Sequence, residues 1–255
     1  MLKLGNPKML KMIDLSSKIA LVTGGGRGIG RAITLALVQA GASLVYITYK
    51  DDPASAWDTV PLGIDKVLPL HCDVTQQQHC RMVAQVIREL GSIDILVNNA
   101  GINRPSPFDE ITLEDWVEVL DVNLTGSFLV TQALLPVIKD GGSIVFMGSV
   151  SGYIGGKVSS HYCASKAGVS ALAANIGLFA APRGIRVNCV APGYVRSPLT
   201  DKGAENPMVR DTIKAIPMGR LAEPEEIANI VCFLASNMSS YITCQTIHVN
   251  GGLYF

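Results

Sequence analysis

The sequence has no excess of charge of either sign. Its 255 residues include 21 basic and 21 acidic side chains, which gives a formal net charge of zero, and charged residues make up only 16% of the chain. Nucleic-acid-binding proteins usually carry an excess of basic side chains, so this balance argues against a nucleic-acid partner. Hydrophobic residues account for 48% of the chain, which is enough to bury one sizeable core.

Long hydrophobic runs are also missing. No uninterrupted apolar run reaches the roughly 18 residues that a membrane-spanning helix needs, so we expect no membrane partner. Residues 1–11 are basic and lack the apolar stretch of a secretory signal. We expect residues 1–12 to be a disordered N-terminal extension, with Met12 as a second plausible start. Residues 13–255 are then expected to form a single domain of a cytoplasmic protein.

The six cysteines show no disulfide pattern. They are scattered through apolar segments, as expected for reduced thiols in a cytosolic core. Two of them follow histidines, in the pairs His71-Cys72 and His79-Cys80. This spacing fits no zinc pattern that we can name, and both pairs flank an ordinary strand-to-helix turn. We therefore expect no metal site.

Short apolar runs alternate with amphipathic segments along the whole chain. We expect strands over residues 18–22, 43–49, 66–72, 93–98, 143–147, 185–190 and 246–249. We expect helices over residues 28–39, 54–60, 75–90 (with Thr75 as N-cap), 113–135, 159–179, 207–216 and 224–235. This alternation predicts an α/β fold, a single Rossmann-type doubly wound parallel sheet of about seven strands with helices on both faces.

Tyr162 and Lys166 are four residues apart in a predicted helix. Such a pair lies on one helix face, one turn apart. A neighbouring ammonium favours the phenolate and lowers the pKa of a phenol, which would tune Tyr162 as a general acid and base. Ser149 lies 13 residues before Tyr162, where its hydroxyl could point at the oxygen that Tyr162 protonates. Taken alone the pair is a weak signal, because both residues are common on helix surfaces.

A glycine-rich turn, Thr23–Gly30, follows the first predicted strand and opens the first predicted helix. Glycines there allow backbone N–H groups to approach a pyrophosphate at the helix N-terminus. The alternative is a merely tight turn, but the strand–turn–helix context favours a dinucleotide site. The residues expected to contact the cofactor here are Gly24, Gly26, Arg27, Gly28, Ile29 and Gly30.

The end of the second predicted strand bears on the choice of dinucleotide. An NAD site usually ends this strand with a carboxylate for the ribose 2′-hydroxyl, but no acid stands at Thr48 or Tyr49. Arg27 and Lys50 are cations that could meet the 2′-phosphate of NADP. We therefore favour NADP(H) over NAD(H). The alternative is that Lys50 is solvated and Asp51 binds the ribose of NAD.

Later strand ends and one helix carry further candidate residues. Asp73 and Val74 follow the third strand, where the carboxylate could accept a hydrogen bond from an adenine amine or simply belong to the turn. Small residues after the fourth strand would let the backbone approach the cofactor, and this group is Asn99, Ala100 and Gly101. Asn123 lies within the predicted helix 113–135, where Asn is a poor helix former. A buried amide needs partners, and a water held near Lys166 would supply them.

Together these motifs resemble those of the classical short-chain dehydrogenase/reductase family over about residues 13–255. The resemblance implies a catalytic set of Asn123, Ser149, Tyr162 and Lys166. It also implies cofactor contacts from Tyr162, Lys166, Pro192, Gly193, Val195 and Ser197. In the implied reaction, the tyrosine protonates a carbonyl oxygen while the nicotinamide delivers hydride. The lysine holds the nicotinamide ribose and lowers the tyrosine pKa, and the serine orients the carbonyl oxygen.

Within that family, the chain is most similar to bacterial 3-oxoacyl-acyl carrier protein reductases, in residues 216–221 and 241–252. These features also occur in relatives that act on sugars, polyols or alcohols. Cys244 stands where glycine is usual. Leu178 and Phe179 stand where a charged pair is usual, which suggests a subunit contact and argues against an acyl carrier protein as partner.

Two classes of function follow from these residues. The first is a hydride-transfer enzyme, with a 3-oxoacyl thioester (acyl carrier protein or CoA) as the best guess and a polyol, sugar or secondary alcohol as the alternative substrate. The second is a non-catalytic dinucleotide-binding regulator, which the intact catalytic set argues against. We expect residues 197–220 to form a substrate lid, and we expect a homotetramer whose contacts include Leu124, Phe128 and Leu178.

Overall fold

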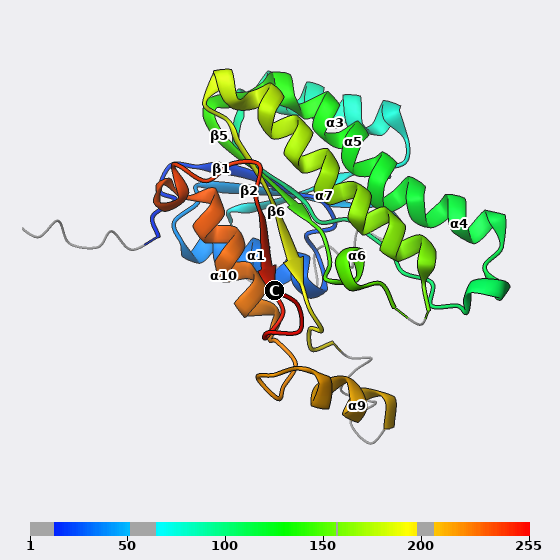
Figure 1. Cartoon of the computed structure of the whole chain (residues 1–255). Helices are drawn as coiled ribbons and strands as arrows, with labels where there is room; N and C mark the ends of the chain where they lie inside the picture. Colours follow the sequence, from blue (N-terminus) through cyan, green and yellow to red (C-terminus); the bar gives the residue numbers. More distant parts are fainter. Residues whose placement is uncertain (1–12, 52–64, 157, 198–206) are drawn as a thin grey trace, which may run out of the picture.

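Seven parallel strands form the centre of the molecule (Figure 1). The computed structural model describes residues 13–51, 65–156, 158–197 and 207–255. The strands are β1 (Ile19–Val22), β2 (Leu44–Tyr49), β3 (Val67–His71), β4 (Ile93–Asn98), β5 (Ile138–Met147), β6 (Arg186–Pro192) and β7 (Thr246–Val249). They lie in the order β3-β2-β1-β4-β5-β6-β7, and each neighbouring pair is parallel. The predicted fold class is confirmed.

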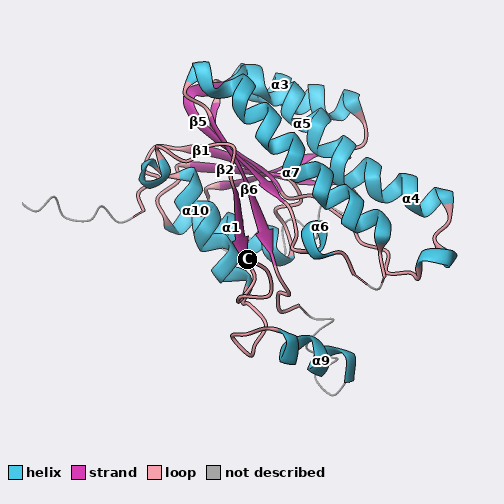
Figure 2. Cartoon of the chain, in the orientation of Figure 1, coloured by secondary structure: helices cyan, strands magenta, loops and turns pink. Residues whose placement is uncertain are grey.

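Helices cover both faces of the sheet (Figure 2). One face carries α1 (Gly28–Gln39) and α10 (Pro224–Ala235). The other face carries α3 (Gln77–Leu90), α5 (Gly126–Leu134) and α7 (Ser160–Ala180). Three further helices are α4 (Leu113–Leu120), α6 (Ser151–Ile154) and α9 (Pro207–Ala215). Because both faces are covered, the central strands are continuous apolar runs, and every residue of β4 is buried.

Helices α1 and α10 pack against each other on one face of the sheet. Ile33 and Leu37 of α1 and Ile227 and Val231 of α10 are fully buried in the same core cluster. Burying an aliphatic side chain of this size stabilises the fold by roughly 1.5–3 kcal/mol. Helix α1, the first helix that the structure describes, is therefore covered by α10, which lies near the C-terminal end of the chain.

Three predicted elements differ clearly from the observed ones, and one observed helix was not predicted. Helix α3 begins at Gln77 and not at Thr75, because the N–H and hydroxyl of Thr75 donate to Asp73 Oδ1 in a turn. The long helix predicted over residues 113–135 is interrupted by a π-helical turn, Asp121–Thr125. Strand β5 begins five residues earlier than predicted. Helix α6 was not predicted, because four residues are too few to show a helical period. The predicted helix 54–60 and residues 1–12 lie outside the described residues.

One helix needs comment because it is both long and apolar. By length and mean hydropathy alone, Ser160–Arg183 could cross a membrane, although the sequence contains no uninterrupted apolar run of that length. In the structure this helix packs against β5, β6 and α6, and it carries the buried polar residues His161, Ser165 and Lys166. Core helices of water-exposed domains pass the same test, so the finding carries no further conclusion.

Candidate active site

The carboxyl ends of the parallel strands meet at one edge of the sheet, where ligands bind in open α/β folds. The glycine-rich turn follows β1, Asn99–Gly101 follow β4, Ser149 follows β5 and Gly193 follows β6. Tyr162 and Lys166 lie in the first two turns of α7. The predicted site residues that the structure describes are therefore gathered at this edge and on the adjoining helix.

The glycine-rich turn excludes side chains at two positions, by close packing at Gly30 and by backbone conformation at Gly24. A Cβ on Gly30 would lie 2.3 Å from the carbonyl oxygen of Gly24 and 2.5 Å from Asn99 Nδ2. Gly24 itself has a φ of +60°, a conformation that other residues rarely adopt. The turn leads directly into α1, whose first backbone N–H groups have no helical partner and favour an anion. These residues fit a dinucleotide pyrophosphate.

Thr23 and Asn99 join the glycine-rich turn to the end of β4. Thr23 is buried, and its Oγ1 accepts hydrogen bonds from the backbone N–H groups of Asn99 and Ala100, both at 2.9 Å. Asn99 Nδ2 in turn donates to the carbonyl oxygens of Thr23 (2.9 Å) and Gly24 (3.2 Å). The sequence predicted a cofactor-binding role for Asn99 but gave no signal for Thr23, a residue type that is common at strand ends.

The end of β2 carries one buried and one exposed candidate. Thr48 is buried, and its Oγ1 accepts a hydrogen bond from the N–H of Gly24 at 3.1 Å. This bond ties the glycine-rich turn to the end of β2. Lys50 is exposed and pairs with Asp73, at 3.0 Å between Nζ and Oδ2. This hydrogen bond raises the pKa of Lys50. Tyr49 is half-buried, with its ring edge-on to His71.

Both carboxylate oxygens of Asp73 already have partners. Oδ2 pairs with Lys50, and Oδ1 accepts from the N–H (3.0 Å) and hydroxyl (2.8 Å) of Thr75. Burial acts to raise the pKa of Asp73, but the hydrogen bonds from Thr75 and Lys50 outweigh it, and the pKa is lowered. Asp73 is thus ionised at neutral pH, and an adenine amine would have to share one of these oxygens.

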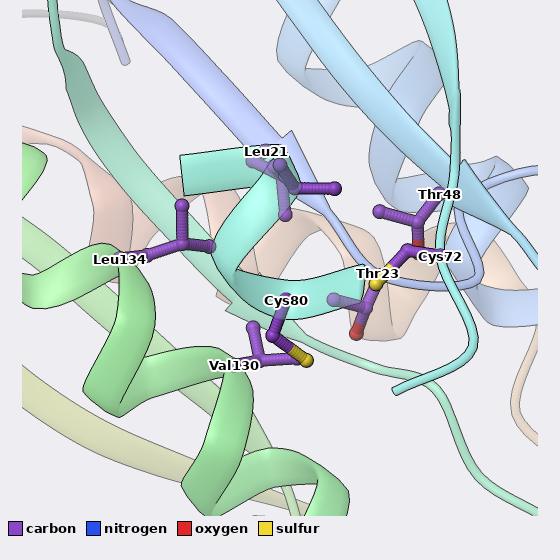
Figure 3. Close-up of a pocket in the computed structure, with 8 residues that line it drawn as sticks. Leu21, Thr23, Thr48, Cys72, Cys80, Val130 and Leu134 are labelled. Carbon is purple, nitrogen blue, oxygen red and sulfur yellow. The ribbon is translucent and has the colours of Figure 1, made fainter. Parts of the chain in front are cut away.

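A small cavity lies beneath this end of the site, between the sheet and helices α3 and α5 (Figure 3). Its lining consists of Leu21, Thr23, Thr48, Cys72, Cys80, Val83, Val130 and Leu134. Both thiols are buried, and the Cys80 thiol donates a hydrogen bond to the carbonyl oxygen of Val74 at 3.6 Å. Among the described residues, no three His, Cys, Asp or Glu side chains gather as metal ligands would. We therefore interpret this cavity as a small gap in the mainly apolar core beneath the site.

Ser149 and Tyr162 form the centre of the candidate active site. Ser149 is buried just beyond β5, and its Oγ accepts a hydrogen bond from the N–H of Ser151 at 3.2 Å. Burial raises the pKa of Tyr162, and a hydrogen bond with Ser149 opposes this effect only in part. The prediction that the pKa of Tyr162 is lowered is therefore wrong for this structure. A raised pKa keeps the phenol protonated at neutral pH.

Lys166 is buried with its ammonium over the face of the Tyr162 ring, 5.6 Å from the ring centroid. Its Nζ donates a hydrogen bond to the carbonyl oxygen of Met147 at 2.7 Å. Burial lowers the pKa of Lys166 to about 8. Because the ammonium lies over the ring and is bonded to Met147, it does not offset the effect of burial on the Tyr162 hydroxyl.

Asn123 lies in the π-helical turn and is buried. Its Oδ1 accepts from the N–H of Ile102 (2.8 Å), and its Nδ2 donates to the carbonyl of Ile102 (2.9 Å) and to Ser165 Oγ (2.9 Å). The amide predicted to hold a water is thus satisfied by protein groups. Sequence reasoning missed Ser165, although it stands between Tyr162 and Lys166.

Gly101 separates Asn123 from Lys166. A Cβ on this glycine would lie 3.1 Å from Asn123 Oδ1 and 3.5 Å from Lys166 Nζ. The absence of a side chain lets the backbone after β4 pass between these two groups. Asn123, Lys166 and the chain at Gly101 therefore form one packed unit beside Tyr162.

The segment after β6 completes this edge of the sheet. The carbonyl of Pro192 accepts from the N–H of Val150 at 2.8 Å, and a Cβ on Gly193 would lie 2.8 Å from the Cα of Asn250. Val195 pairs with Ala222 in an isolated bridge. Ser197 is the last residue described before the gap at 198–206, so that part of the predicted lid lies outside the described residues.

A hollow of about 80 Å³ adjoins this segment. Its lining consists of Tyr194, Ile216, Met218, Arg220, Ala222, Glu226, Val249, Asn250 and Gly251. It therefore lies between the end of β7 and the residues that follow α9. This is the same edge of the sheet, at the carboxyl ends of the strands, as the glycine-rich turn and Gly193.

Comparison with known proteins agrees with this geometry. A family model described as enoyl-(acyl carrier protein) reductase matches residues 24–254. A 3-oxoacyl-(acyl carrier protein) reductase of Thermotoga maritima is 41% identical over 94% of this chain and 98% of its own length. An acetoacetyl-CoA reductase of Rhizobium meliloti is also 41% identical, over 94% and 99%.

Solved structures are similar as well. The crystal structure of gox2181 has a TM-score of 0.89 at 36% identity, and it covers 94% of this chain and 97% of that one. A putative gluconate dehydrogenase from Agrobacterium tumefaciens has a TM-score of 0.87 at 32% identity, with the same coverage. Together with the arrangement of Ser149, Tyr162 and Lys166, these relatives show that the chain belongs to the short-chain dehydrogenase/reductase family and is a nicotinamide-dependent oxidoreductase.

Proposed function

We propose that this protein reduces the 3-oxo group of an acyl thioester to a hydroxyl group with NADPH. The observation that carries the proposal is the convergence of Ser149, Tyr162 and Lys166 at the sheet edge beside the glycine-rich turn. Relatives named for 3-oxoacyl and acetoacetyl thioesters, each about 40% identical over nearly the whole chain, support the choice of substrate.

The protonated state of Tyr162 favours the direction of reduction. A phenol whose pKa is raised holds its proton at neutral pH and can give it to a carbonyl oxygen as negative charge develops there. Ser149 lies within hydrogen-bonding reach of that phenol and would donate to the same carbonyl oxygen. When bound, the nicotinamide supplies the hydride.

Lys166 and Asn123 would hold the cofactor and the neighbouring backbone in place for this step. The Lys166 ammonium already lies over the Tyr162 ring, and we assign it to the ribose hydroxyls of the nicotinamide half. Asn123 fixes the chain at Ile102 and thereby holds the Gly101 backbone beside the ammonium. The backbone near Gly193 and Val195 is assigned to the nicotinamide amide, with Ser197 beside it.

Exposed apolar side chains in the segment that joins Ser149 to Tyr162 favour an acyl substrate over a polyol. Ile154 of α6 and Val158, which precedes α7, are exposed by 47% and 43%. Both lie in the segment between Ser149 and Tyr162. A polyol would leave such apolar groups unpaired with its hydroxyls, whereas an acyl chain can cover them.

A single assay tests the proposed activity. Purified protein is given NADPH and acetoacetyl-CoA, and the loss of NADPH absorbance is followed. We expect turnover by the natural chain and at least a ~10³-fold loss in Tyr162→Phe, because that variant cannot donate the proton. NADPH binding, measured by fluorescence, should be unchanged in Tyr162→Phe. Undiminished turnover in this variant would refute the assignment of Tyr162. Oxidation of polyols without thioester reduction would refute the substrate class.

We also propose that Lys50 makes NADPH the preferred cofactor. Its ammonium is exposed and held at the end of β2 by Asp73, where the 2′-phosphate would be met. We expect Lys50→Gln to weaken NADPH binding about tenfold and to leave NADH binding within about twofold, because one charge-assisted contact is worth roughly 1.5–3 kcal/mol. Lys66→Gln, an exposed lysine at the start of β3, is the control and should change neither. Equal loss for both cofactors would contradict the proposal.

The remaining assignments concern the surroundings of the enzyme. We infer that it works in the cytoplasm, where nicotinamide cofactors and reducing conditions suit its free cysteines. The thioester carrier is either CoA or an acyl carrier protein, and parallel assays with both distinguish them. We further infer a homotetramer, because α7 exposes Leu178 and Phe179 by 72% and 74%.

A further inference from the structure

The hydroxyl of Ser165 joins the π-helical turn to the helix that carries the proposed acid. Ser165 lies on α7 between Tyr162 and Lys166 and is fully buried. Its Oγ accepts a hydrogen bond from Asn123 Nδ2 at 2.9 Å and donates one to the carbonyl oxygen of Tyr162 at 2.8 Å. One hydroxyl therefore connects the Asn123 amide to the backbone of the residue proposed to donate the proton.

The other side of the Asn123 amide is equally fixed. Its Oδ1 and Nδ2 pair with the N–H and carbonyl of Ile102 in the way that two backbone peptides pair between strands. Asn123 Oδ1 and Lys166 Nζ both lie close to Gly101. The chain after β4, the π-helical turn and the first turns of α7 are thus linked by one continuous set of hydrogen bonds through Ser165.

We propose that Ser165 is a positioning residue for the reaction, and this inference rests on the proposed function. Through its bond to Asn123, Ser165 fixes how α7 is rotated about its axis and how far it is shifted along it, relative to the backbone at Ile102. The positions of Tyr162 and Lys166, which lie on α7, are fixed in the same way. That backbone belongs to the expected cofactor site, whereas Tyr162 faces the substrate. Ser165 therefore sets the distance between the hydride donor and the proton donor, and it contacts only the backbone carbonyl of Tyr162 and not the reacting hydroxyl.

The variant Ser165→Ala removes this link at the cost of one buried, unpaired N–H on Asn123. Such a group is unfavourable by roughly 1–3 kcal/mol, so the amide is expected to reorient and α7 to shift slightly. Because displacements well under 1 Å already slow reactions that depend on alignment, we expect kcat to fall about 10–100-fold. Binding of NADPH, measured by fluorescence, should change by less than about threefold, since the glycine-rich turn does not involve Ser165.

The pH dependence of kcat separates positioning from simple destabilisation. The pKa of Tyr162 depends on its burial and on its hydrogen bond with Ser149, so moving α7 must move it. We expect the pH profile of kcat in Ser165→Ala to shift by at least about half a unit. Ser165→Cys keeps the shape of the side chain, with a slightly larger atom and a weaker hydrogen-bonding group, and it should recover part of kcat.

Ser143→Ala is the matched control. Ser143 is also buried and also donates one hydrogen bond to a backbone carbonyl, that of Leu234 at 2.9 Å, but it lies in β5 away from the catalytic residues. We expect a similar loss of thermal stability in both alanine variants. Only Ser165→Ala should show the lower kcat and the shifted pH profile.

A double substitution closes the test. If Ser165 acts through Asn123, the variant Asn123→Ala/Ser165→Ala should be no slower than Asn123→Ala alone. Additive losses, or a wild-type kcat and pH profile in Ser165→Ala, would overturn the proposal. If Ser165→Ala fails to fold, Ser165→Cys carries the test: full kcat with an unshifted pH profile despite its weaker hydrogen bonds would again overturn the proposal.

The proposed function itself fails separately, when the natural chain shows no thioester reduction with NADPH. In that case kcat and its pH profile are compared between the natural chain and the variants with whichever carbonyl or alcohol the natural chain turns over. The comparison between the Ser165 and Ser143 variants keeps its meaning there, because it concerns alignment and not the identity of the substrate.

Discussion

Lys166 is a positive charge held in a site that excludes water. Only 5% of its surface is exposed, and burial lowers its pKa from 10.5 to about 8. At neutral pH the lysine is still mostly protonated, so the folded protein bears the cost of a desolvated ammonium. One hydrogen bond, to the carbonyl of Met147, offsets part of this cost. A charge maintained under these conditions is typical of functional sites.

This cost predicts that Lys166→Met stabilises the fold while abolishing turnover. Each unit of pKa corresponds to about 1.4 kcal/mol, so the full shift of Lys166 sets an upper limit of about 3 kcal/mol. Because Met147 loses a partner, we expect a gain of about 1–2 kcal/mol at about pH 7 in urea unfolding. The exposed substitution Lys66→Met should give no gain.

The sign of the pH dependence follows from the lowered pKa. Above about pH 8 the folded lysine releases its proton while the unfolded chain keeps it up to about pH 10.5, so the stability of the natural chain rises relative to Lys166→Met across this window. The advantage of the variant should therefore shrink between about pH 7 and about pH 9.5. A constant advantage would mean that burial of the charge is not its source.

At the residue scale, the sequence indicated which residues carry the chemistry but not which residues hold them in place. The four-residue spacing of Tyr162 and Lys166 and the position of Ser149 after a strand could be read directly. Thr23 and Ser165 could not, because a buried hydroxyl acts through distances that only the folded chain defines. The direction of the Tyr162 pKa was mispredicted for the same reason, since it depends on burial more than on the neighbouring charge.

Helix α6 is held against α7 by a glycine. A Cβ on Gly152 would lie 2.7 Å from the backbone nitrogen of Ala167 and 2.9 Å from the carbonyl carbon of Lys166. Backbone atoms cannot rotate away, so any side chain at this position must push the two helices apart. The short helix that follows Ser149 is therefore in direct contact with the backbone of the proposed lysine.

We predict that Gly152→Ala destabilises the protein and slows turnover. The clash should cost about 1–3 kcal/mol, which outweighs the gain of about 1 kcal/mol in helix propensity. Gly168→Ala on α7 is the comparison, because its Cβ would meet only the end of the Leu124 side chain, 2.8 Å away, which can rotate. Thermal unfolding and kcat of both variants provide the measurement. An equal or larger loss in Gly168→Ala would contradict this account.

At the element scale, apolar runs and helical periods predicted the strands and most helices well, because packing on both faces demands them. The π-helical turn at Asp121–Thr125 could not be predicted. Its extra residue is stabilised by tertiary contacts of Asn123 with Ile102 and Ser165, which leave no periodic trace in the sequence.

The molecule as a whole exposes apolar groups at the end of α7. Leu178 and Phe179 are largely exposed, and Phe128 of α5 is exposed by 41%. Leu124, which was also predicted to join the subunit contact, is partly buried against the core between the sheet and helices α3, α5 and α7. A patch of this kind is costly in water and is usually covered by a partner, here proposed to be further copies of the chain.

We predict that Leu178→Lys/Phe179→Lys yields a smaller, folded species. Light scattering at micromolar concentration should give the mass of a tetramer for the natural chain and a lower mass for the variant, because burial of each side chain contributes roughly 1.5–3 kcal/mol to an interface. Leu90→Lys, a similarly exposed leucine at the end of α3, should leave the mass unchanged. A monomeric natural chain would refute the proposed tetramer.

The packing of α1 on α10 has a consequence for how the protein is made. The ribosome synthesises β1 to β4 and the glycine-rich turn first, yet the α1 face that carries Ile33 and Leu37 meets α10 only when residues 227–231 have emerged. At about 5–20 residues per second, the nascent chain keeps that apolar helix face open for roughly 10–40 seconds. The end of the sheet that is proposed to bind the cofactor is thus completed by one of the last described helices to leave the ribosome, and we expect a truncated translation product to lack a settled cofactor site.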